Sequence, residues 1–296
     1  MDDLKTGSAT DEAAVPDRYG FSSKYGTKLW YRNGKPHRED GPAIIRENGD
    51  KLWYRNGDCH REGGPAIEHA EGTRFWLQHN KVHRVGGPAV ENSDGSSEWY
   101  QNGLRHREDG PAVEMANGDK EWYQHNKFHR EDAPAIERAD GHREWRLNGL
   151  YFRKDGGPVV ETKEGDRIWR NADGALHRKD GPAIERADGG KLWYFDGVPH
   201  RDDGPAMEYA NGDRVWCRHG AYHREGGPAI ERANGTKEYW IGGTQVEDLP
   251  VESDAWRLRY KDQREPGFAA GASEARVTRI SEKAFWRNDG SWGAQH

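Results

Sequence analysis

The sequence predicts an all-β fold, an elongated antiparallel array of β-hairpin repeats that forms an open single-layer twisted sheet or solenoid. Three observations lead to this prediction. A proline recurs every 23 or 24 residues, a tryptophan recurs in step with it, and each interval contains two Asn-Gly-type turn signals. A fixed period of about 20–50 residues is the mark of a repeat architecture.

The prolines define nine units, which we place within residues 20–247. They lie at Pro42, Pro65, Pro88, Pro111, Pro134, Pro158, Pro182, Pro205 and Pro228. We assign a structural role to the tryptophans that keep the same step, namely Trp30, Trp53, Trp76, Trp99, Trp122, Trp145, Trp169, Trp193 and Trp216. Tyr239 takes a tenth position in this series.

The composition fits a thin structure. Only 33% of the residues are hydrophobic, although the chain has 13 Trp and 12 Tyr. Aromatic side chains bury a large area each, so a few of them per unit can hold a single sheet together. The net charge of −6 comes from 45 basic and 51 acidic residues that are well mixed. We therefore expect no nucleic-acid partner, because a binder of nucleic acid carries a basic stripe.

One turn signal of each unit follows the proline. A two-residue type I′ turn at Asn48-Gly49 pairs Ile44 with Trp53, and the same construction gives an aliphatic–tryptophan or aliphatic–tyrosine pair in each unit. The pairs continue as Ile67–Trp76, Val90–Trp99, Val113–Trp122, Ile136–Trp145, Val160–Trp169, Ile184–Trp193, Met207–Trp216 and Ile230–Tyr239.

The other turn signal follows the tryptophan. A two-residue turn at Asn33-Gly34 pairs Trp30 with His37, and later units repeat this pair. One face should then carry aliphatic, Trp and His side chains. Alternation along a strand places Glu and Arg on the opposite face, where Glu114 lies opposite Glu121 and Glu121 opposite Arg130. We expect that face to be ionic and wetted.

The segment His-Arg-x-Asp-Gly-Pro-Ala joins the two hairpins. Proline cannot donate to a ladder, so it marks an edge, a bend or a bulge. A bent strand that pairs backward and then forward gives two strands per unit. A tight turn at Asp40-Gly41 would instead give three strands, with successive units running in alternate directions. We favour two strands.

The order Trp30-x-x-x-Gly34-x-x-His37-x-x-x-Gly41, repeated along residues 20–247, resembles MORN repeats. The chain departs from them where Arg follows the His and Pro-Ala follows the Gly. This divergent form looks like tandem repeats of phage, large-virus and bacterial proteins. The resemblance implies stacked hairpin units and a role in assembly or in binding to proteins or membrane lipids. It brings no catalytic residue.

The ends of the chain differ from the array. Residues 1–19 are polar and predict a flexible arm. Residues 248–296 predict a short, partly helical cap, with helical spacing over Ala272–Arg287, or alternatively a docking element for a partner. The two cysteines, Cys59 and Cys217, are expected to be free thiols, and the N-terminus has no signal-peptide pattern. We expect a cytoplasmic protein, in the host cytoplasm if a phage or virus encodes it.

The recurring polar residues were weighed as sites. Imidazoles of successive units would lie ~10 Å apart across two strands, too far to share a metal, so we expect no metal and no cofactor. The His position is also Phe152 in one unit. The Glu–Glu–Arg rows recur, whereas a catalytic pair is normally singular, so we expect no catalytic residue and no enzyme.

Two binding readings stay open. The candidate binding residues are the arginines Arg38, Arg61, Arg84, Arg107, Arg130, Arg178, Arg201 and Arg224, which could grip an anionic ligand or pair with neighbouring acids. We expect a scaffold for a protein partner, such as a host-defence or virion component, or for another copy of the chain. The alternative is a module for glycans or anionic ligands that uses the Trp and Arg rows. No apolar run is long enough to span a bilayer, and peripheral lipid contact is left open.

Overall fold

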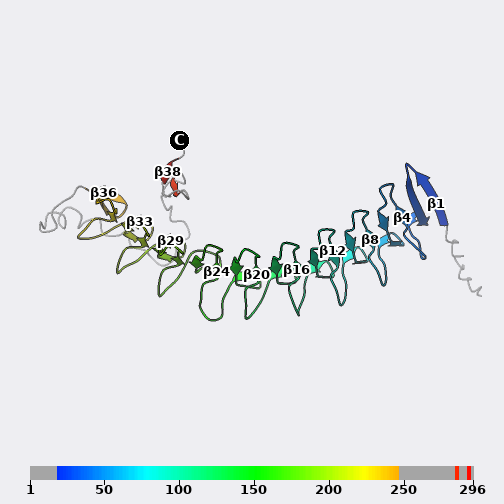
Figure 1. Cartoon of the computed structure of the whole chain (residues 1–296), viewed down its shortest axis with the longest axis horizontal. Helices are drawn as coiled ribbons and strands as arrows, with labels where there is room; N and C mark the ends of the chain where they lie inside the picture. Colours follow the sequence, from blue (N-terminus) through cyan, green and yellow to red (C-terminus); the bar gives the residue numbers. More distant parts are fainter. Residues whose placement is uncertain (1–18, 247–283, 287–291, 295–296) are drawn as a thin grey trace, which may run out of the picture. The chain divides into compact units, whose positions relative to one another are not determined.

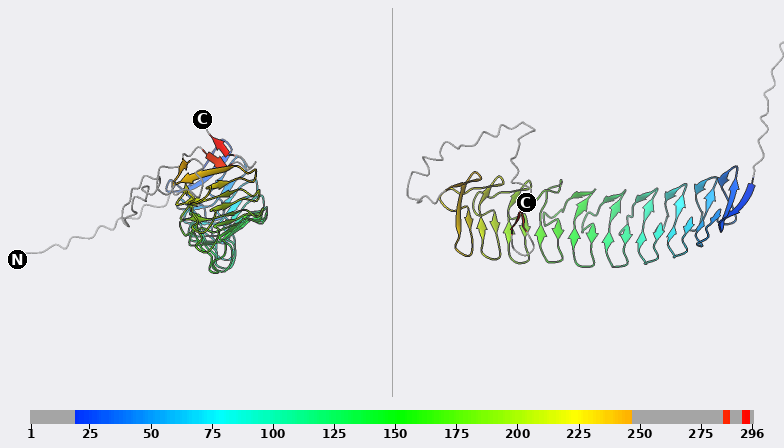
Figure 2. Two further views of the ribbon diagram at one scale, coloured as in Figure 1. Left: turned by 90° about the vertical axis from the view of Figure 1, so that its left-hand side faces the viewer. Right: turned by 90° about the horizontal axis from the view of Figure 1, so that it is seen from above.

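The computed structural model of the chain describes residues 19–246, 284–286 and 292–294. Residues 19–246 contain one antiparallel sheet of 22 short strands. Figure 1 shows the units following one another in a single row from β1 to β36, and Figure 2 shows the same succession of short strands from above. The predicted all-β hairpin array is confirmed.

Each unit contributes one hairpin to this sheet, and we call it the sheet hairpin. The nine sheet hairpins are β4–β5 (Ile44–Ile45 and Lys51–Leu52), β8–β9 (Ile67–Glu68 and Arg74–Phe75), β12–β13 (Val90–Glu91 and Ser97–Glu98), β16–β17 (Val113–Glu114 and Lys120–Glu121), β20–β21 (Ile136–Glu137 and Arg143–Glu144), β24–β25 (Val160–Glu161 and Arg167–Ile168), β26–β27 (Ile184–Glu185 and Lys191–Leu192), β30–β31 (Met207–Glu208 and Arg214–Val215) and β34–β35 (Ile230–Glu231 and Lys237–Ile241).

A second, smaller hairpin follows each tryptophan, and we call it the outer hairpin. The outer hairpins are β2–β3 (Thr27–Arg32 and Lys35–Pro36), β6–β7 (Tyr54–Arg55 and Asp58–Cys59), β10–β11 (Leu77–Gln78 and Lys81–Val82), β14–β15 (Tyr100–Gln101 and Leu104–Arg105), β18–β19 (Tyr123–Gln124 and Lys127–Phe128), β22–β23 (Arg146–Leu147 and Leu150–Tyr151), the bridge between Arg170 and Leu176, β28–β29 (Tyr194–Phe195 and Val198–Pro199), β32–β33 (Cys217–Arg218 and Ala221–Tyr222) and β35–β36 (Lys237–Ile241 and Thr244–Val246). At the N-terminal end, β1 (Tyr19–Lys24) pairs with β2.

The turn of the outer hairpin has the predicted form. Asn33 and Gly34 both have positive φ, at 51° and 75°, as a type I′ turn requires. The backbone N–H of His37 donates to the carbonyl of Trp30 at 3.0 Å, which confirms the Trp–His pairing. In the divergent unit, Phe152 takes the place of His and donates in the same way to Trp145.

The register predicted for the sheet hairpin is wrong by one residue. Ile44 pairs with Leu52 and Ile45 with Lys51, because Glu47–Gly49 form a three-residue loop in place of a two-residue turn. The N–H of Arg46 donates to the carbonyl of Asp50, and Gly49 has a φ of 96°. This is a turn followed by a left-handed glycine, a common three-residue hairpin loop. The predicted aliphatic–tryptophan pairs therefore do not form.

A shift of one residue moves a whole row to the other face of a sheet. Glu114 lies opposite Lys120, and Val113 lies opposite Glu121, so the predicted Glu114–Glu121 pair does not occur. Trp122 is instead bonded across to Ala135, whose carbonyl accepts from its N–H at 2.8 Å. Trp122 therefore lies on the same face of the sheet as Lys120 and Glu114, and the other units repeat this arrangement. The predicted separation of a Trp face from a Glu/Arg face is incorrect.

The bend between the hairpins agrees with the two-strand reading. Residues 58–60 pair with residues 53–55 to form an outer hairpin. After the bend, residues 66–68 pair both with residues 51–53 and with the next strand of the sheet. Each unit thus adds two strands to the 22-stranded sheet. The units of 24 residues absorb the extra residue in a loop, for example in the bend between Arg153 and Pro158.

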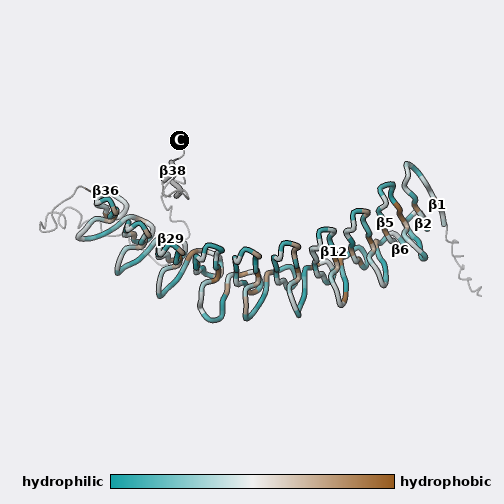
Figure 3. Tube along the Cα trace, in the orientation of Figure 1, coloured by the Kyte–Doolittle hydropathy of each residue, from teal (hydrophilic) through white to brown (hydrophobic). Residues whose placement is uncertain are grey.

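The core is thin and lies along the strands. The alanine that follows each proline has no exposed surface in eight of the units, and Val159 replaces it in the ninth. Ala112, Val113 and Tyr123 form one such cluster, against which Trp99 and Phe128 pack. In Figure 3 the hydrophobic colour is confined to short stretches of the array, and the loops between them are hydrophilic.

The terminal segments lie largely outside the described residues. Of the arm predicted over residues 1–19, only Tyr19 is described, and it begins β1. Of the predicted cap, residues 284–286 (β37, Ala284–Trp286) and 292–294 (β38, Trp292–Ala294) form an antiparallel strand pair. The helix predicted over Ala272–Arg287 is therefore wrong for residues 284–286, and its remainder lies outside the described residues.

Candidate functional site

The recurrent arginines lie over the tryptophans of their own units. The guanidinium carbon of Arg61 is 4.0 Å from the ring centre of Trp53, and the same contact recurs in every unit at 3.7–4.2 Å. A guanidinium over an indole face is favourable because the ring carries negative charge on its faces. The contacts join Arg38 to Trp30, Arg84 to Trp76, Arg107 to Trp99, Arg130 to Trp122, Arg153 to Trp145, Arg178 to Trp169, Arg201 to Trp193 and Arg224 to Trp216.

Arg153 belongs to this row, although the sequence pattern did not single it out. The unit has Phe152 in place of the usual His and one extra residue before its proline. The signal that identifies Arg153 is its place directly after the residue that pairs with the tryptophan. Its contacts with Trp145, Pro158 and Glu161 match those of the other arginines.

The same arginines hold the bend closed. Nη1 of Arg61 donates to the carbonyl of Pro65 and to Oε1 of Glu68, both at 3.0 Å. The glutamate partners of the later units are Glu91, Glu114, Glu137, Glu161, Glu185, Glu208 and Glu231. In the first unit Ile45 occupies the glutamate position, and Nε of Arg38 donates to Asp40 at 2.9 Å. The hydrogen bond from Arg38 lowers the pKa of Asp40.

Each of these tryptophans is therefore covered by an arginine that is itself hydrogen-bonded to the bend. One ring face meets a guanidinium, and Trp145 and Trp169 are only 9% exposed. Nε1 of Trp169 also donates to the carbonyl of Gly156 at 3.1 Å. The structure places the predicted binding arginines and the predicted structural tryptophans in one continuous cluster per unit.

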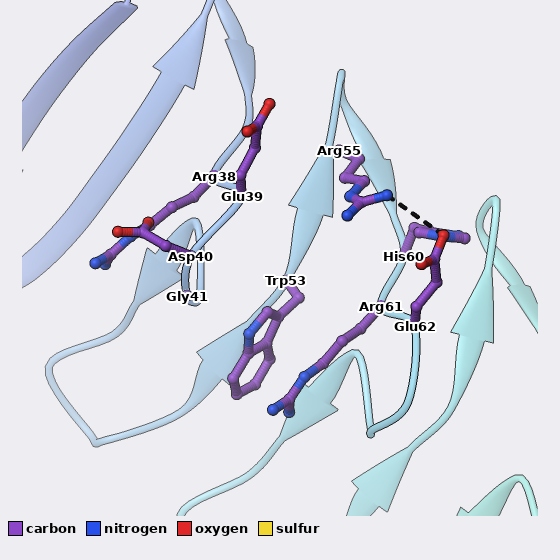
Figure 4. Close-up of a pocket in the computed structure, with 9 residues that line it drawn as sticks. All are labelled: Arg38, Glu39, Asp40, Gly41, Trp53, Arg55, His60, Arg61 and Glu62. Atoms are coloured by element: carbon purple, nitrogen blue, oxygen red, sulfur yellow. Dashed lines mark hydrogen bonds and ion pairs between the residues drawn. The ribbon is translucent and has the colours of Figure 1, made fainter.

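A hollow lies between the bends of adjacent units (Figure 4). The one between the first two bends has a volume of about 480 Å³ and is lined on one side by Arg38–Gly41 and on the other by Trp53, His60 and Glu62. Arg55 reaches across the second bend to Glu62 at 3.4 Å.

The tips of the bends form a row of exposed carboxylates, which we call the acidic ridge. Glu108 and Asp109 are 82% and 86% exposed on one bend, and Asp202 and Asp203 are 75% and 83% exposed on another. The ridge consists of Glu39, Asp40, Glu62, Glu108, Asp109, Glu131, Asp132, Asp155, Asp180, Asp202, Asp203 and Glu225. Lys154 and Lys179 are the cations at equivalent positions.

A second charged row crosses the sheet itself. Within all but one of the sheet hairpins that carry a glutamate bonded to a bend arginine, the residue paired with that glutamate is a cation, as for Arg74 with Glu68 and Lys120 with Glu114. We call this the cation row. It consists of Lys28, Lys51, Arg74, Lys120, Arg143, Arg167, Lys191, Arg214 and Lys237, all exposed, and Ser97 takes one position.

The histidines join adjacent units. Nδ1 of His83 accepts a hydrogen bond from the backbone N–H of Asn102, in the next outer turn, at 3.1 Å. Seven histidines make this bond, namely His37, His60, His83, His129, His177, His200 and His223. The sequence predicted only that each histidine pairs with the tryptophan of its own unit. It did not predict this contact, which depends on how successive units align.

The loops of the sheet hairpins also join adjacent units, and we call each such set of hydrogen bonds between units a seam. Oδ1 of Asp50, which is 2% exposed, accepts from the N–H of Ala70 at 2.9 Å. That backbone hydrogen bond is the main reason why the pKa of Asp50 is lowered to about 2. Asp119, Asp166 and Asp213 accept in the same way from later units.

Among the residues described, one group could hold a metal ion. Asp50, His69 and Glu71 place a ligand atom each within 4.8 Å of one another. Asp50 already accepts from Ala70, and its Oδ2 lies 3.4 Å from Nη1 of Arg46. These contacts compete with a cation, and no other unit has the same three residue types at these positions.

The cysteines are free, as predicted, and both are buried. Burial raises the pKa of the Cys59 thiol to about 11 and that of the Cys217 thiol to about 12. A thiol with a raised pKa is a poor nucleophile because the thiolate is the reactive form. Neither cysteine therefore has the setting of a catalytic nucleophile.

No protein-family model and no curated protein sequence matches the chain. No helix among the described residues is long and apolar enough to cross a membrane.

Proposed function

We propose that this protein is a non-enzymatic interaction scaffold, a divergent MORN-like repeat array that binds a protein partner along its bends. The supporting observation is the recurrence of the bend along the row, with exposed carboxylates at the tips of eight of the nine bends and a hollow between the first two (Figure 4). Weak contacts made by several units add up when one partner engages them together. An extended array is suited to that mode of binding.

The repeat form supports the MORN-like assignment. The aromatic–Gly–His order, the period of 23 or 24 residues and the hairpin units agree with what that resemblance implies. The divergent step His-Arg-x-Asp-Gly-Pro has a structural reason in this chain. The arginine stacks on tryptophan and donates to the carbonyl of the proline, so the step closes the bend.

The distribution of polar groups argues against an enzyme. A catalytic site needs a nucleophile, base or acid in a setting that differs from its surroundings. Here the carboxylates and arginines recur from unit to unit and bond to each other, as Glu114 bonds to Arg107. The alternative of a glycan-binding tryptophan row has less support, because an arginine covers one face of each of the nine indoles.

The test is chemical cross-linking of the full chain in an extract of the cells that express it, followed by mass spectrometry. The purified partner is then measured by biolayer interferometry against wild type and against a variant with Glu108→Lys, Asp132→Lys and Asp202→Lys. We expect cross-links at several consecutive bends and at least tenfold weaker binding by the variant. A matched control, Glu71→Lys, Glu164→Lys and Asp188→Lys in the sheet-hairpin loops, should bind like wild type.

Two results would contradict the proposal. One is that purified partners bind wild type and the bend variant equally well. The other is that an oligosaccharide panel shifts tryptophan fluorescence, which would favour the glycan reading.

A further inference from the structure

The residues of the cation row are exposed, and the glutamates paired with them in the sheet are also bonded to bend arginines. Each glutamate beside the row is already bonded to a bend arginine, as Glu137 is to Arg130 at 2.7 Å. Arg74 and Arg143 reach their cross-strand glutamates only at 3.7 Å and remain 56% and 54% exposed. Arg167 also pairs with Glu185. The eight bend arginines already match the eight glutamates in charge, so the nine cations of the row add positive charge that these glutamates do not balance.

The cation row has a regular spacing. Successive members belong to alternate strands of one sheet, as Lys120, Arg143 and Arg167 do. Strands lie ~4.8 Å apart, so the cations recur about every 10 Å. A partner matches this row best if it presents carboxylates at the same spacing.

The acidic ridge has that spacing, because each bend with an acidic tip belongs to the same repeat as one member of the cation row. The third bend has Val85 at its tip, and Ser97 takes the corresponding position of the row. Glu108, Asp132 and Asp202 are 82%, 81% and 75% exposed. Asp132 lies 3.7 Å from the exposed Lys154, and such an exposed pair is weak, so all three carboxylates are accessible to another molecule. Hydrogen bonds from Arg107 and Arg201 lower the pKa values of the neighbouring Asp109 and Asp203, which favours the ionised form of these two carboxylates.

We propose that two copies of the chain associate side by side, with the acidic ridge of each against the cation row of the other. A two-fold arrangement uses both rows twice, once in each direction. The inference rests on the proposed scaffold role, since it names a second copy as a partner of the bend surface. Exposed ion pairs are individually weak and screened by salt, so the association depends on many units and on low ionic strength.

Two reversed variants of the full chain test this arrangement. Variant C carries Lys120→Glu, Arg143→Glu and Arg167→Glu in the cation row. Variant R carries Glu108→Lys, Asp132→Lys and Asp202→Lys in the ridge. Each alone opposes like charges, whereas an equimolar mixture restores opposite charges at both contacts of the pair. The matched control, Lys35→Glu, Lys81→Glu and Lys127→Glu, changes exposed lysines of the outer hairpins by the same charge as variant C.

Light scattering after size exclusion and sedimentation velocity measure the mass at low salt and at high salt. We expect wild type and the control to dimerise at low salt and dissociate at high salt. Variants C and R should each dimerise at least tenfold more weakly, and their mixture should recover the dimer. Circular dichroism checks folding. The triple variant Lys120→Ser, Arg143→Ser and Arg167→Ser, which introduces the residue type that the chain itself has at Ser97, serves as a milder form of variant C.

The inference is overturned if wild type stays monomeric at low salt, or if variants C and R dimerise like wild type. Failure of the mixture to recover the dimer also overturns it. A monomeric wild type that still binds a different protein through its bends would leave the proposed scaffold role standing. If wild type neither self-associates nor binds a different protein through its bends, both proposals are contradicted.

Discussion

The guanidinium carbon of Arg107 lies 4.0 Å from the ring centre of Trp99. The same guanidinium donates to the carbonyl of Pro111 and to Glu114 at 3.1 and 3.0 Å. One side chain therefore links the tryptophan, the bend and the charged row of its unit. A lysine cannot reproduce this, because an ammonium lacks the planar fork that stacks and donates at once.

Arg107→Lys should lower the free energy of unfolding by about 1–2 kcal/mol, from the lost stacking and a weakened charged hydrogen bond. Urea unfolding followed by tryptophan fluorescence measures it. The control is Arg143→Lys in the exposed cation row, which should change stability by no more than about 0.5 kcal/mol. Equal effects of the two substitutions would mean that the contacts of Arg107 with Trp99, Pro111 and Glu114 do not add to the free energy of unfolding.

Glu121 is a buried carboxylate, at 7% exposure. It accepts from the hydroxyl of Tyr123 at 3.0 Å and pairs with Arg138 at 2.7 Å. Glu121→Ala removes the partner of both groups and should cost about 1.5–3 kcal/mol, as for hydrogen bonds to charged groups. Glu108→Ala, on the ridge, should cost little by the same unfolding measurement. A harmless Glu121→Ala would be inconsistent with this residue facing the core.

The seam from His83 to Asn102 can be tested by a substitution that the chain itself uses at an equivalent position, Phe152. His83→Phe keeps an aromatic ring but removes the acceptor for the N–H of Asn102. We expect a loss of about 1 kcal/mol and faster amide hydrogen exchange at Asn102. The amide of His219, which bonds to His200 in a distant unit, is the internal control. Unchanged protection at Asn102 would contradict the seam.

Asp50 predicts a dependence on acid. Its pKa is lowered from 3.8 to about 2, first by the backbone hydrogen bond from Ala70. A lowered pKa means that the folded state favours the carboxylate, so the stabilisation is complete above the unfolded value and is lost as the pH falls towards 2. Asp50→Asn keeps an acceptor for Ala70 and removes the charge.

The stability difference between wild type and Asp50→Asn should therefore shrink as the pH is lowered from about 5 to about 2. Urea unfolding at a series of pH values gives this difference. The contributions of the other aspartates with lowered pKa values are the same in both proteins and cancel. A difference that stays constant or grows over that interval would show that Asp50 is not a stabilising carboxylate.

The sequence predicted the fold well because the repeats report the same local choice many times. The glycine of Asn33-Gly34 needs a positive φ, and the proline of each bend cannot donate to a ladder. Those local constraints were sufficient for the hairpins, the two strands per unit and the Trp–His pair. They required no knowledge of how one unit meets the next.

The sheet-hairpin register was missed because Asn48-Gly49 fits both a two-residue turn and a three-residue loop that ends in a left-handed glycine. The predicted contact of Glu114 with Glu121 was the available warning, since like charges directly opposite are destabilising. With the loop one residue longer, Glu114 meets Lys120.

The candidate site followed only in part from the sequence. The sequence predicted the eight arginines as binding residues, on the face opposite the tryptophans, and therefore missed the contacts between the two rows, such as Arg130 over Trp122. The seams at His83 and Asp50 join residues of different units. Such contacts depend on the alignment of successive units, which no local turn signal specifies.

The register of the sheet hairpin determines which residues share the charged face, and engineered disulfides test it most directly. Met115 donates to the carbonyl of Asp119, so Glu114 and Lys120 form the adjacent non-hydrogen-bonded pair. Cα atoms of such pairs lie about 4.5 Å apart, within the range of a disulfide. The matched control joins Glu114 to Glu121, the pair expected from a two-residue turn.

Each double variant, Glu114→Cys with Lys120→Cys and Glu114→Cys with Glu121→Cys, is oxidised mildly in the folded state and mapped by peptide mass spectrometry. The account predicts a nearly complete disulfide in the first variant and little in the second, with Cys59 and Cys217 remaining reduced. A disulfide that forms readily between positions 114 and 121, and poorly between 114 and 120, would contradict the register and with it the shared face of the tryptophan, arginine and cation rows.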